Sequence, residues 1–214
     1  NVNANALISQ PSLLSAFLAS NNVSCNSSAD GVVQALAFGG SPGYFYTWTN
    51  GATTSTINDL PPGTYSLVVS DVNGCTTSGV GVVGEPAALN LTVTATDVLC
   101  TGNSNGIANA NVNGGTPSYS YEWSNSSVVL GAGSVITGLS VGNYTLVVTD
   151  LTGCTIKGFA VLAQPAILTI TLTSTDATCN LNNGSASAVV TGGTGAYTYL
   201  WSNGGTASSI QNLT

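Results

Sequence analysis

Few side chains of this chain could carry out chemistry. Its 214 residues include five cysteines, eight carboxylates and a single basic residue, Lys157, but no histidine. Nucleophilic catalysis normally needs a base such as histidine beside the nucleophile. Glu85 and Glu122 could be imagined as a glycosidase pair, but neither lies in a sequence context that builds a cleft. We therefore expect no catalytic residue, no cofactor and no enzymatic activity.

The cysteines are the remaining candidates for chemistry. No two of them have the Cys-x-x-Cys spacing of a zinc site, and there is no histidine to act as the other common zinc ligand. We therefore expect no metal site. Disulfide bonds are the favoured role and would place the protein in an oxidising compartment, with free structural thiols as the alternative. The five residues are Cys25, Cys75, Cys100, Cys154 and Cys179.

Charged residues are scarce in this chain. They make up 4% of it, and the net charge is −7, whereas an ordinary soluble domain has about 25% charged residues. Binding of nucleic acid or of anionic lipid needs clustered Lys and Arg, so we expect neither. No apolar run reaches the roughly 18 residues of a membrane-spanning helix, so membrane insertion is not expected either.

Several sequence landmarks return at one interval and define an internal repeat. Cys25 returns as Cys100 and Cys179, at intervals of 75 and 79 residues. A Trp, a Gln/Glu-Pro pair and a Gly-Gly pair keep the same register. They are Trp48, Trp123 and Trp201; Gln10-Pro11, Glu85-Pro86 and Gln164-Pro165; and Gly39-Gly40, Gly114-Gly115 and Gly192-Gly193.

These landmarks predict three repeats, at residues 9–84, 85–163 and 164–214, of which the third is incomplete. Residues 1–8 match residues 155–162 and are expected to be the last strand of a preceding repeat. The chain is thus expected to be a window of a longer array.

The alternation of apolar and polar residues within each repeat predicts short β-strands. Asn50-Gly51 and Asn203-Gly204 predict hairpin turns, because Asn and Gly tolerate positive φ. Six or seven strands per repeat are typical of an immunoglobulin-like sandwich. We therefore expect an all-β fold of tandem immunoglobulin-like β-sandwich domains in an elongated array. In the second repeat the expected strands are 89–96, 107–112, 119–123, 135–136, 144–149 and 155–162.

The first two repeats follow the order Cys, Asp/Asn-Gly, Gly-Gly, Tyr-x-Tyr-x-Trp, Leu-x-x-Gly-x-Tyr, Asp-x-x-Gly-Cys and Glu/Gln-Pro, and the third matches it up to Leu213. This order resembles the SprB repeat, found in large surface proteins of Bacteroidota that include the mobile adhesin of gliding motility. The turn after Trp123 departs from the pattern, with Ser126 where Gly51 stands in the first repeat. The first repeat carries the motif at Cys25, Asp30-Gly31, Gly39-Gly40, Tyr44, Tyr46, Trp48, Leu60, Gly63, Tyr65, Asp71, Gly74, Cys75 and Glu85-Pro86. The second carries it at Cys100, Asn105-Gly106, Gly114-Gly115, Tyr119, Tyr121, Trp123, Leu139, Gly142, Tyr144, Asp150, Gly153, Cys154 and Gln164-Pro165.

The resemblance implies export across the outer membrane by type IX secretion, followed by display at the cell surface. We therefore expect an extracellular, outer-membrane-associated protein. Its expected partners are neighbouring repeats or subunits of the same array or filament, with surface polysaccharide as a further candidate.

The position of the cysteines within the repeat predicts how they pair. The first cysteine precedes the second strand, and the other follows the Asn-Gly or Thr-Gly turn. We pair Cys25 with Cys75 and Cys100 with Cys154, and we expect the partner of Cys179 to lie beyond Thr214.

The aromatic residues are expected to be structural. Trp48, Trp123 and Trp201 are predicted core residues, although a stacking platform for sugars is the alternative. Tyr65 and Tyr144 are predicted to be tyrosine corners, whose hydroxyl groups bind backbone.

The residue pairs Asp71/Asn73 and Asp150/Thr152 could in principle bind calcium, but calcium takes about six to eight oxygen ligands and each repeat has few carboxylates. Hydrogen bonds to their own backbone in a turn are the favoured role of these residues.

The sequence is compatible with three functions. The leading hypothesis is a disulfide-stapled stalk in a large secreted surface protein or filament that acts in adhesion or gliding motility. The alternatives are a glycan-binding module that uses exposed aromatic residues and a filament subunit that exchanges strands. A surface hydrolase module has no supporting residue.

Overall fold

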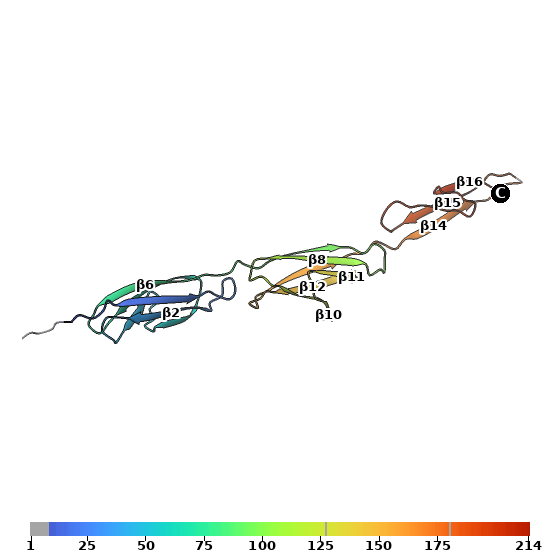
Figure 1. Ribbon diagram of the computed structural model, residues 1–214. Helices are drawn as coiled ribbons and strands as arrows, with labels where there is room; N and C mark the ends of the chain where they lie inside the picture. Colours follow the sequence, from blue (N-terminus) through green and yellow to red (C-terminus); the bar gives the residue numbers. More distant parts are fainter. Residues whose placement is uncertain (1–8, 127, 180) are drawn as a thin grey trace, which may run out of the picture. The chain divides into compact units, whose positions relative to one another are not determined.

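A computed structural model of the protein describes residues 9–126, 128–179 and 181–214. These residues form 16 β-strands and no helix, as the sequence predicts for an all-β fold (Figure 1). No helix that could span a membrane is therefore present in the described part of the chain. The strand predicted at residues 1–8 lies outside the described residues.

The chain divides into two compact units. The first holds the described residues up to Asn90 together with 112–119 and 149–156 of the second repeat. The second holds residues 91–111, 120–148 and 157–214. Two loops of the second repeat thus belong to the same compact unit as the whole first repeat.

The first repeat is a sandwich of two antiparallel three-stranded sheets, with strand orders β1-β2-β4 and β3-β5-β6. This division matches strands A, B and E and strands C, F and G of an immunoglobulin-like sandwich. The first sheet contains β1 (Ser15–Asn21), β2 (Gly31–Phe38) and β4 (Thr56–Leu60). The second contains β3 (Phe45–Trp48), β5 (Gly63–Ser70) and β6 (Thr76–Val83).

The core of the first repeat comes from the period-two alternation of its strands. Along β2, alternate residues from Gly31 onward are buried and the residues between them are mostly exposed. The cluster of buried hydrophobic residues consists of Val23, Val33, Ala35, Ala37, Trp48, Ile57, Leu60, Leu67, Val69 and Val83.

The second repeat has the same two sheets, with strand orders β7-β8-β11 and β10-β9-β12-β13. The strands predicted from the sequence are all present, with ends that differ by a few residues at most. The short β10 was not predicted; it lies in the longer insert after Trp123. The bounds are β7 (Asn90–Thr96), β8 (Gly106–Asn113), β9 (Ser120–Asn125), β10 (Val128–Gly131), β11 (Val135–Leu139), β12 (Gly142–Thr149) and β13 (Thr155–Leu162).

The described part of the third repeat forms a single antiparallel sheet of β14 (Thr169–Thr175), β15 (Gly184–Thr191) and β16 (Ser209–Leu213). Its order, β14-β15-β16, corresponds to that of β1-β2-β4. The register also agrees, because Gly184 pairs with Leu213 as Gly31 pairs with Leu60.

A β-bulge recurs beside this Gly–Leu pair in all three repeats. The residue before the leucine has positive φ each time: Asp59 at 54°, Gly138 at 74° and Asn212 at 57°. Asp, Asn and Gly are the residues that adopt this conformation at the lowest cost, so the bulge explains their choice here.

Candidate functional site

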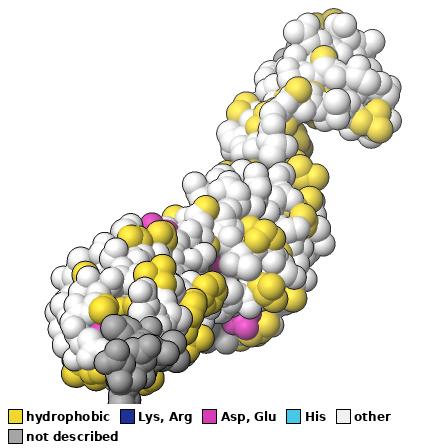
Figure 2. Space-filling view, turned by 60° about the vertical axis from the view of Figure 1, so that its left-hand side comes forward, with side chains coloured by type: hydrophobic (Ala, Val, Ile, Leu, Met, Phe, Trp, Pro, Cys, Tyr) yellow, Lys and Arg dark blue, Asp and Glu magenta, His cyan; other side chains and the backbone are white. Residues whose placement is uncertain are grey.

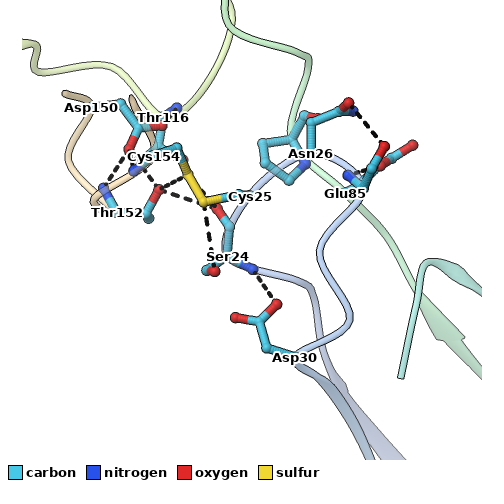
Figure 3. The surroundings of a disulfide bond; sticks show 11 residues. Ser24, Cys25, Asn26, Asp30, Glu85, Thr116, Asp150, Thr152 and Cys154 are labelled. Carbon is cyan, nitrogen blue, oxygen red and sulfur yellow. Dashed lines mark hydrogen bonds between the residues drawn. A yellow bond between two sulfur atoms is a disulfide. The ribbon is translucent and has the colours of Figure 1, made fainter. Parts of the chain in front are cut away.

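A disulfide bond joins Cys25 of the first repeat to Cys154 of the second (Figure 3). The two Cα atoms lie 5.7 Å apart, and both residues belong to the same compact unit. The predicted pairs Cys25–Cys75 and Cys100–Cys154 are therefore wrong. Cys75, Cys100 and Cys179 are free and exposed.

The length of β6 explains why Cys25 does not pair with Cys75. Cys75 directly precedes β6, whereas Glu85, two residues after its end, accepts a hydrogen bond from Ser27 beside Cys25. The eight residues of β6 span about 26 Å at 3.3 Å per residue. The two cysteines of one repeat thus lie at opposite ends of the sandwich, too far apart to bond.

The loop that carries Cys25, residues 24–30, is called the Cys turn. The Ser24 amide donates a 3.0 Å hydrogen bond to Oδ1 of Asp30, and the Ser28 amide donates to the Cys25 carbonyl. Hydrogen bonds from the side chain and the backbone of Ser24 lower the pKa of Asp30. An Asp or Asn at the end of the turn therefore fixes the residue that precedes the cysteine.

The Cys turn also binds the linker between β6 and β7, residues 84–89. Asn26 Nδ2 donates to the Pro86 carbonyl at 3.1 Å, and the Ser27 amide donates to Oε2 of Glu85 at 2.7 Å (Figure 3). The Glu85 carboxylate therefore takes part in the linker contact, which gives this residue a structural role.

Cys154 lies in a second loop, residues 150–154, called the Asp turn. The Asp150 carboxylate accepts hydrogen bonds from the amides of Thr116 at 2.8 Å and of Thr152 and Cys154 at 2.9 Å each. These bonds lower the pKa of Asp150, and the bond from Thr116 has the largest effect. Together they outweigh the burial of the carboxylate, which raises the pKa. The Thr152 hydroxyl lies within hydrogen-bonding distance of the Ser24 carbonyl, at 3.1 Å, which connects the Asp turn directly to the Cys turn.

The second glycine of the Gly-Gly pair makes room for the Asp turn. Gly115 has φ of 60°, and a Cβ atom there would lie 2.6 Å from Oδ2 of Asp150. Gly40 occupies the same place in the first repeat, where its Cβ would lie 2.7 Å from Oδ2 of Asp71. Any side chain at these positions would displace the carboxylate on which the turn depends.

The same Asp turn, residues 71–75, exists in the first repeat although Cys75 is free. Asp71 accepts hydrogen bonds from the amides of Ser41, Asn73 and Cys75 at 2.9 to 3.0 Å, which lower its pKa, Ser41 contributing most. Both aspartates thus make the turn-forming bonds, and in the described residues no group of three or more Cys, Asp or Glu could hold a metal ion.

The Trp and the first Tyr of each motif triad donate hydrogen bonds to the backbone of their own repeat. Trp48 and Trp123 are buried, and Trp201 is half-buried. Each indole N–H donates to a backbone carbonyl, and the first Tyr of each triad donates to the carbonyl of the first glycine in the Gly-Gly pair. The indole bonds are Trp48 to Thr54, Trp123 to Gly133 and Trp201 to Ala207. The tyrosine bonds are Tyr44 to Gly39, Tyr119 to Gly114 and Tyr197 to Gly192.

Tyr65 and Tyr144 have the geometry of tyrosine corners. The Tyr65 hydroxyl donates to the Pro61 carbonyl at 2.7 Å, and that of Tyr144 donates to the Ser140 carbonyl at 2.8 Å. Tyr144 is buried, whereas Tyr65 is half-buried. Each ring thus ties the start of its strand to the residue four positions earlier.

Sequence reasoning recognised the Asp/Asn-Gly and Glu/Gln-Pro pairs only as repeat landmarks. The structure shows that Asp30 shapes the Cys turn and that Glu85 and Pro86 hold it. The available signal was their constant distance from the nearest cysteine, because Asp30 and Asn105 both follow a cysteine by five residues.

A family model described as the SprB repeat matches the chain three times, at residues 18–53, 92–128 and 171–206. No curated protein sequence matches it. Among solved structures, three N-terminal domains of the Hoc capsid protein of bacteriophage RB49 are 18% identical with a TM-score of 0.47, covering 84% of this chain and 69% of that one. A Dscam structure is 16% identical with a TM-score of 0.34, covering 76% and 45%.

Proposed function

Because the chain belongs to the SprB-repeat family, we propose that it is a structural segment of a large secreted bacterial surface protein, in which it serves as a disulfide-linked stalk. The observation that carries the proposal is the Cys25–Cys154 bond, which joins one repeat covalently to the next. A disulfide of this kind persists in oxidising surroundings, which fits a location outside the cytoplasm.

The surface also fits a spacer. On the face that Figure 2 shows, apolar side chains lie among uncharged side chains and backbone, and few acidic groups are visible. The Trp and the first Tyr of each motif triad donate hydrogen bonds to backbone carbonyls, and the motif carboxylates Asp71 and Asp150 accept backbone hydrogen bonds. These aromatic and acidic side chains of the motif therefore stabilise the fold, and we assign them no catalytic role.

The finer form of the proposal places the chain at the outer membrane of a gliding bacterium after type IX export, with repeats bounded at 9–84, 85–163 and 164–214. Antibodies against residues 9–163 should label intact cells, and brief proteinase K treatment should remove the label. Labelling only after permeabilisation would contradict a surface location.

A domain-replacement experiment separates a spacer from a binder. Residues 9–163 are replaced in the native gene by two unrelated disulfide-containing sandwiches of equal length. A stalk role predicts that cells still attach to surfaces under flow, whereas a Gly/Ser linker of equal residue number fails to support attachment. Loss of attachment with the sandwich replacement as well as with the Gly/Ser linker would show that these repeats themselves bind the target.

Glycan binding is the second candidate, favoured by two exposed phenylalanines on one face of the first repeat. Phe17 on β1 lies opposite Leu36, and Phe38 on β2 lies opposite Ser15, so both rings project from the same side of the sheet. Sugars commonly stack on such rings. A glycan array probed with the chain should give a signal that Phe17→Ser and Phe38→Ser abolish, and an array without signal excludes this candidate for the sugars it carries.

Strand exchange between subunits is the third candidate, favoured by the exposed apolar residues of β14. Ile170 and Leu172 are each 61% exposed. Intact mass of the native protein tests this candidate. A subunit near 21.3 kDa favours exchange, and a much larger chain contradicts it.

A further inference from the structure

The junction between the second and third repeats contains the same structural elements as the junction between the first and second repeats. The Leu99 amide donates to Oδ1 of Asn105 at 3.1 Å, as Ser24 does to Asp30, and the Asn103 amide donates to the Cys100 carbonyl. Residues 99–105 therefore form a second Cys turn, which presents Cys100 as the first presents Cys25.

This second Cys turn binds its linker in the same way. Thr101 Oγ1 donates to the Pro165 carbonyl at 2.8 Å, and the Gly102 amide donates to Oε1 of Gln164 at 3.1 Å. The linker in turn binds the next Gly-Gly pair, because the Ala166 carbonyl accepts from Gly193 as that of Ala87 accepts from Gly115.

The two junctions differ in what fills the space beside the cysteine. At the first, a cavity of about 290 Å³ is lined by Cys25, linker residues and Gly115, and also by Cys154, Thr155 and Ile156. At the second, a cavity of about 520 Å³ is lined by Cys100, the matching linker residues and Gly193, without a second cysteine. The second cavity has no counterpart of Cys154, Thr155 and Ile156, which line the first one.

The Asp turn of the first repeat shows that this turn is present without a disulfide at its cysteine. Its internal hydrogen bonds match those of residues 150–154. The backbone amide of Asp71 donates to the Cys75 carbonyl at 3.0 Å, and the backbone amide of Asp150 donates to the Cys154 carbonyl at 2.9 Å. The free Cys75 is exposed at the end of a turn already in the bonded geometry.

We propose that the disulfides of this array form a regular ladder, in which the Cys turn of each repeat bonds to the Asp turn of the following repeat. Cys100 is then the site for an Asp-x-x-Gly-Cys turn of the third repeat, and Cys75 is the site for a Cys turn of a preceding repeat. Two thiols give up two protons and two electrons for each bond, and the disulfide of an exchange catalyst or of oxidised glutathione takes them up and leaves as two thiols. The ladder does not depend on the stalk function.

The full chain extended by a copy of residues 141–163 after Thr214 tests the ladder, since Thr214 occupies the place of Ser140. The extended chain is oxidised in glutathione buffer, acid-quenched, digested with pepsin and mapped by mass spectrometry without reduction. The expected bonds are Cys25–Cys154 and Cys100 to the added copy of Cys154, with Cys75 and Cys179 left as thiols. A bond from the added copy to Cys179, or an added copy that stays reduced while Cys25–Cys154 forms, overturns the proposal.

Two control variants sharpen the result. With Cys100→Ser in the extended chain, the added cysteine should remain a thiol. A disulfide between the added cysteine and Cys179 would show that the position in the fold does not determine which cysteine it bonds. With Cys154→Ser in the unextended chain, Cys25 should remain a thiol. A new Cys25–Cys75 bond in that variant contradicts the ladder directly.

Discussion

The first and third repeats share one sheet plan but differ in what covers it. Leu18 on β1 packs against Gly79 of β6, where a Cβ atom would lie 2.5 Å from its Cδ1. The matching Leu172 on β14 is 61% exposed, because no opposing sheet is present in the described part of the third repeat. Register and bulge are nevertheless the same in both. Strand pairing is thus set locally by each sheet, whereas burial depends on the second sheet.

Removal of the disulfide should have the largest effect, and it should be confined to the first two repeats. The bond spans 129 residues, and closing a loop of that size stabilises by about 5 kcal/mol in the chain-entropy model. Cys154→Ser should lower the free energy of unfolding in urea, followed through the indole N–H signals of Trp48 and Trp123. Cys179→Ser is the matched control and should change nothing. An unchanged urea midpoint in Cys154→Ser would show that the bond has no energetic role.

The matching tryptophans test the difference in burial. Trp48→Ala should cost about 3–5 kcal/mol, as for other large core truncations, because this residue is only 2% exposed. Trp201→Ala should cost less than about 2 kcal/mol, because its ring is partly exposed already. Thermal unfolding of both variants provides the measurement, and equal losses would mean that the third repeat has a core of its own.

Acid should destabilise the first and second repeats more than the third. The pKa values of Asp71 and Asp150 are lowered below the ordinary 3.8 by bonds from backbone amides. Their stabilisation is therefore complete above pH 3.8 and is lost as the pH falls through the folded-state values. Asp71→Asn should remove that dependence in the first repeat, measured as unfolding midpoints between pH 2 and 7, whereas Asp176→Asn serves as a control. A pH profile that is unchanged by Asp71→Asn would contradict this role.

The smallest effect is expected at the tyrosine corners, where each hydroxyl makes one backbone bond. Tyr144→Phe should cost about 1 kcal/mol, and slightly more than Tyr65→Phe because Tyr144 is buried. Urea unfolding of the two variants decides this. A larger loss of unfolding free energy for Tyr65→Phe would indicate that the hydroxyl of the more exposed ring contributes more to stability.

The sequence predicted strands far better than it predicted the covalent links. The alternation that defines β13 is visible in residues 155–162, and the structure has the same bounds. The disulfide could not be read from periodicity, because pairing Cys25 with Cys75 and pairing it with Cys154 both respect the repeat. Strand order distinguishes them: Cys25 follows β1 and Cys75 follows β5, and these two loops lie at opposite ends of an immunoglobulin-like sandwich. The extra β10 was missed because the insert after Trp123 has no counterpart in the first repeat.

The disulfide also changes how the chain transmits tension. A pull along the chain enters through β1, reaches Cys25, crosses to Cys154 and leaves through β13, so the peptide between the two cysteines carries no load. That bypassed peptide has 128 residues, because the bond has a sequence separation of 129, and it would extend to about 450 Å if released. Unfolding of either bypassed core therefore adds no length while the bond is intact, and the two repeats act as a short inextensible link.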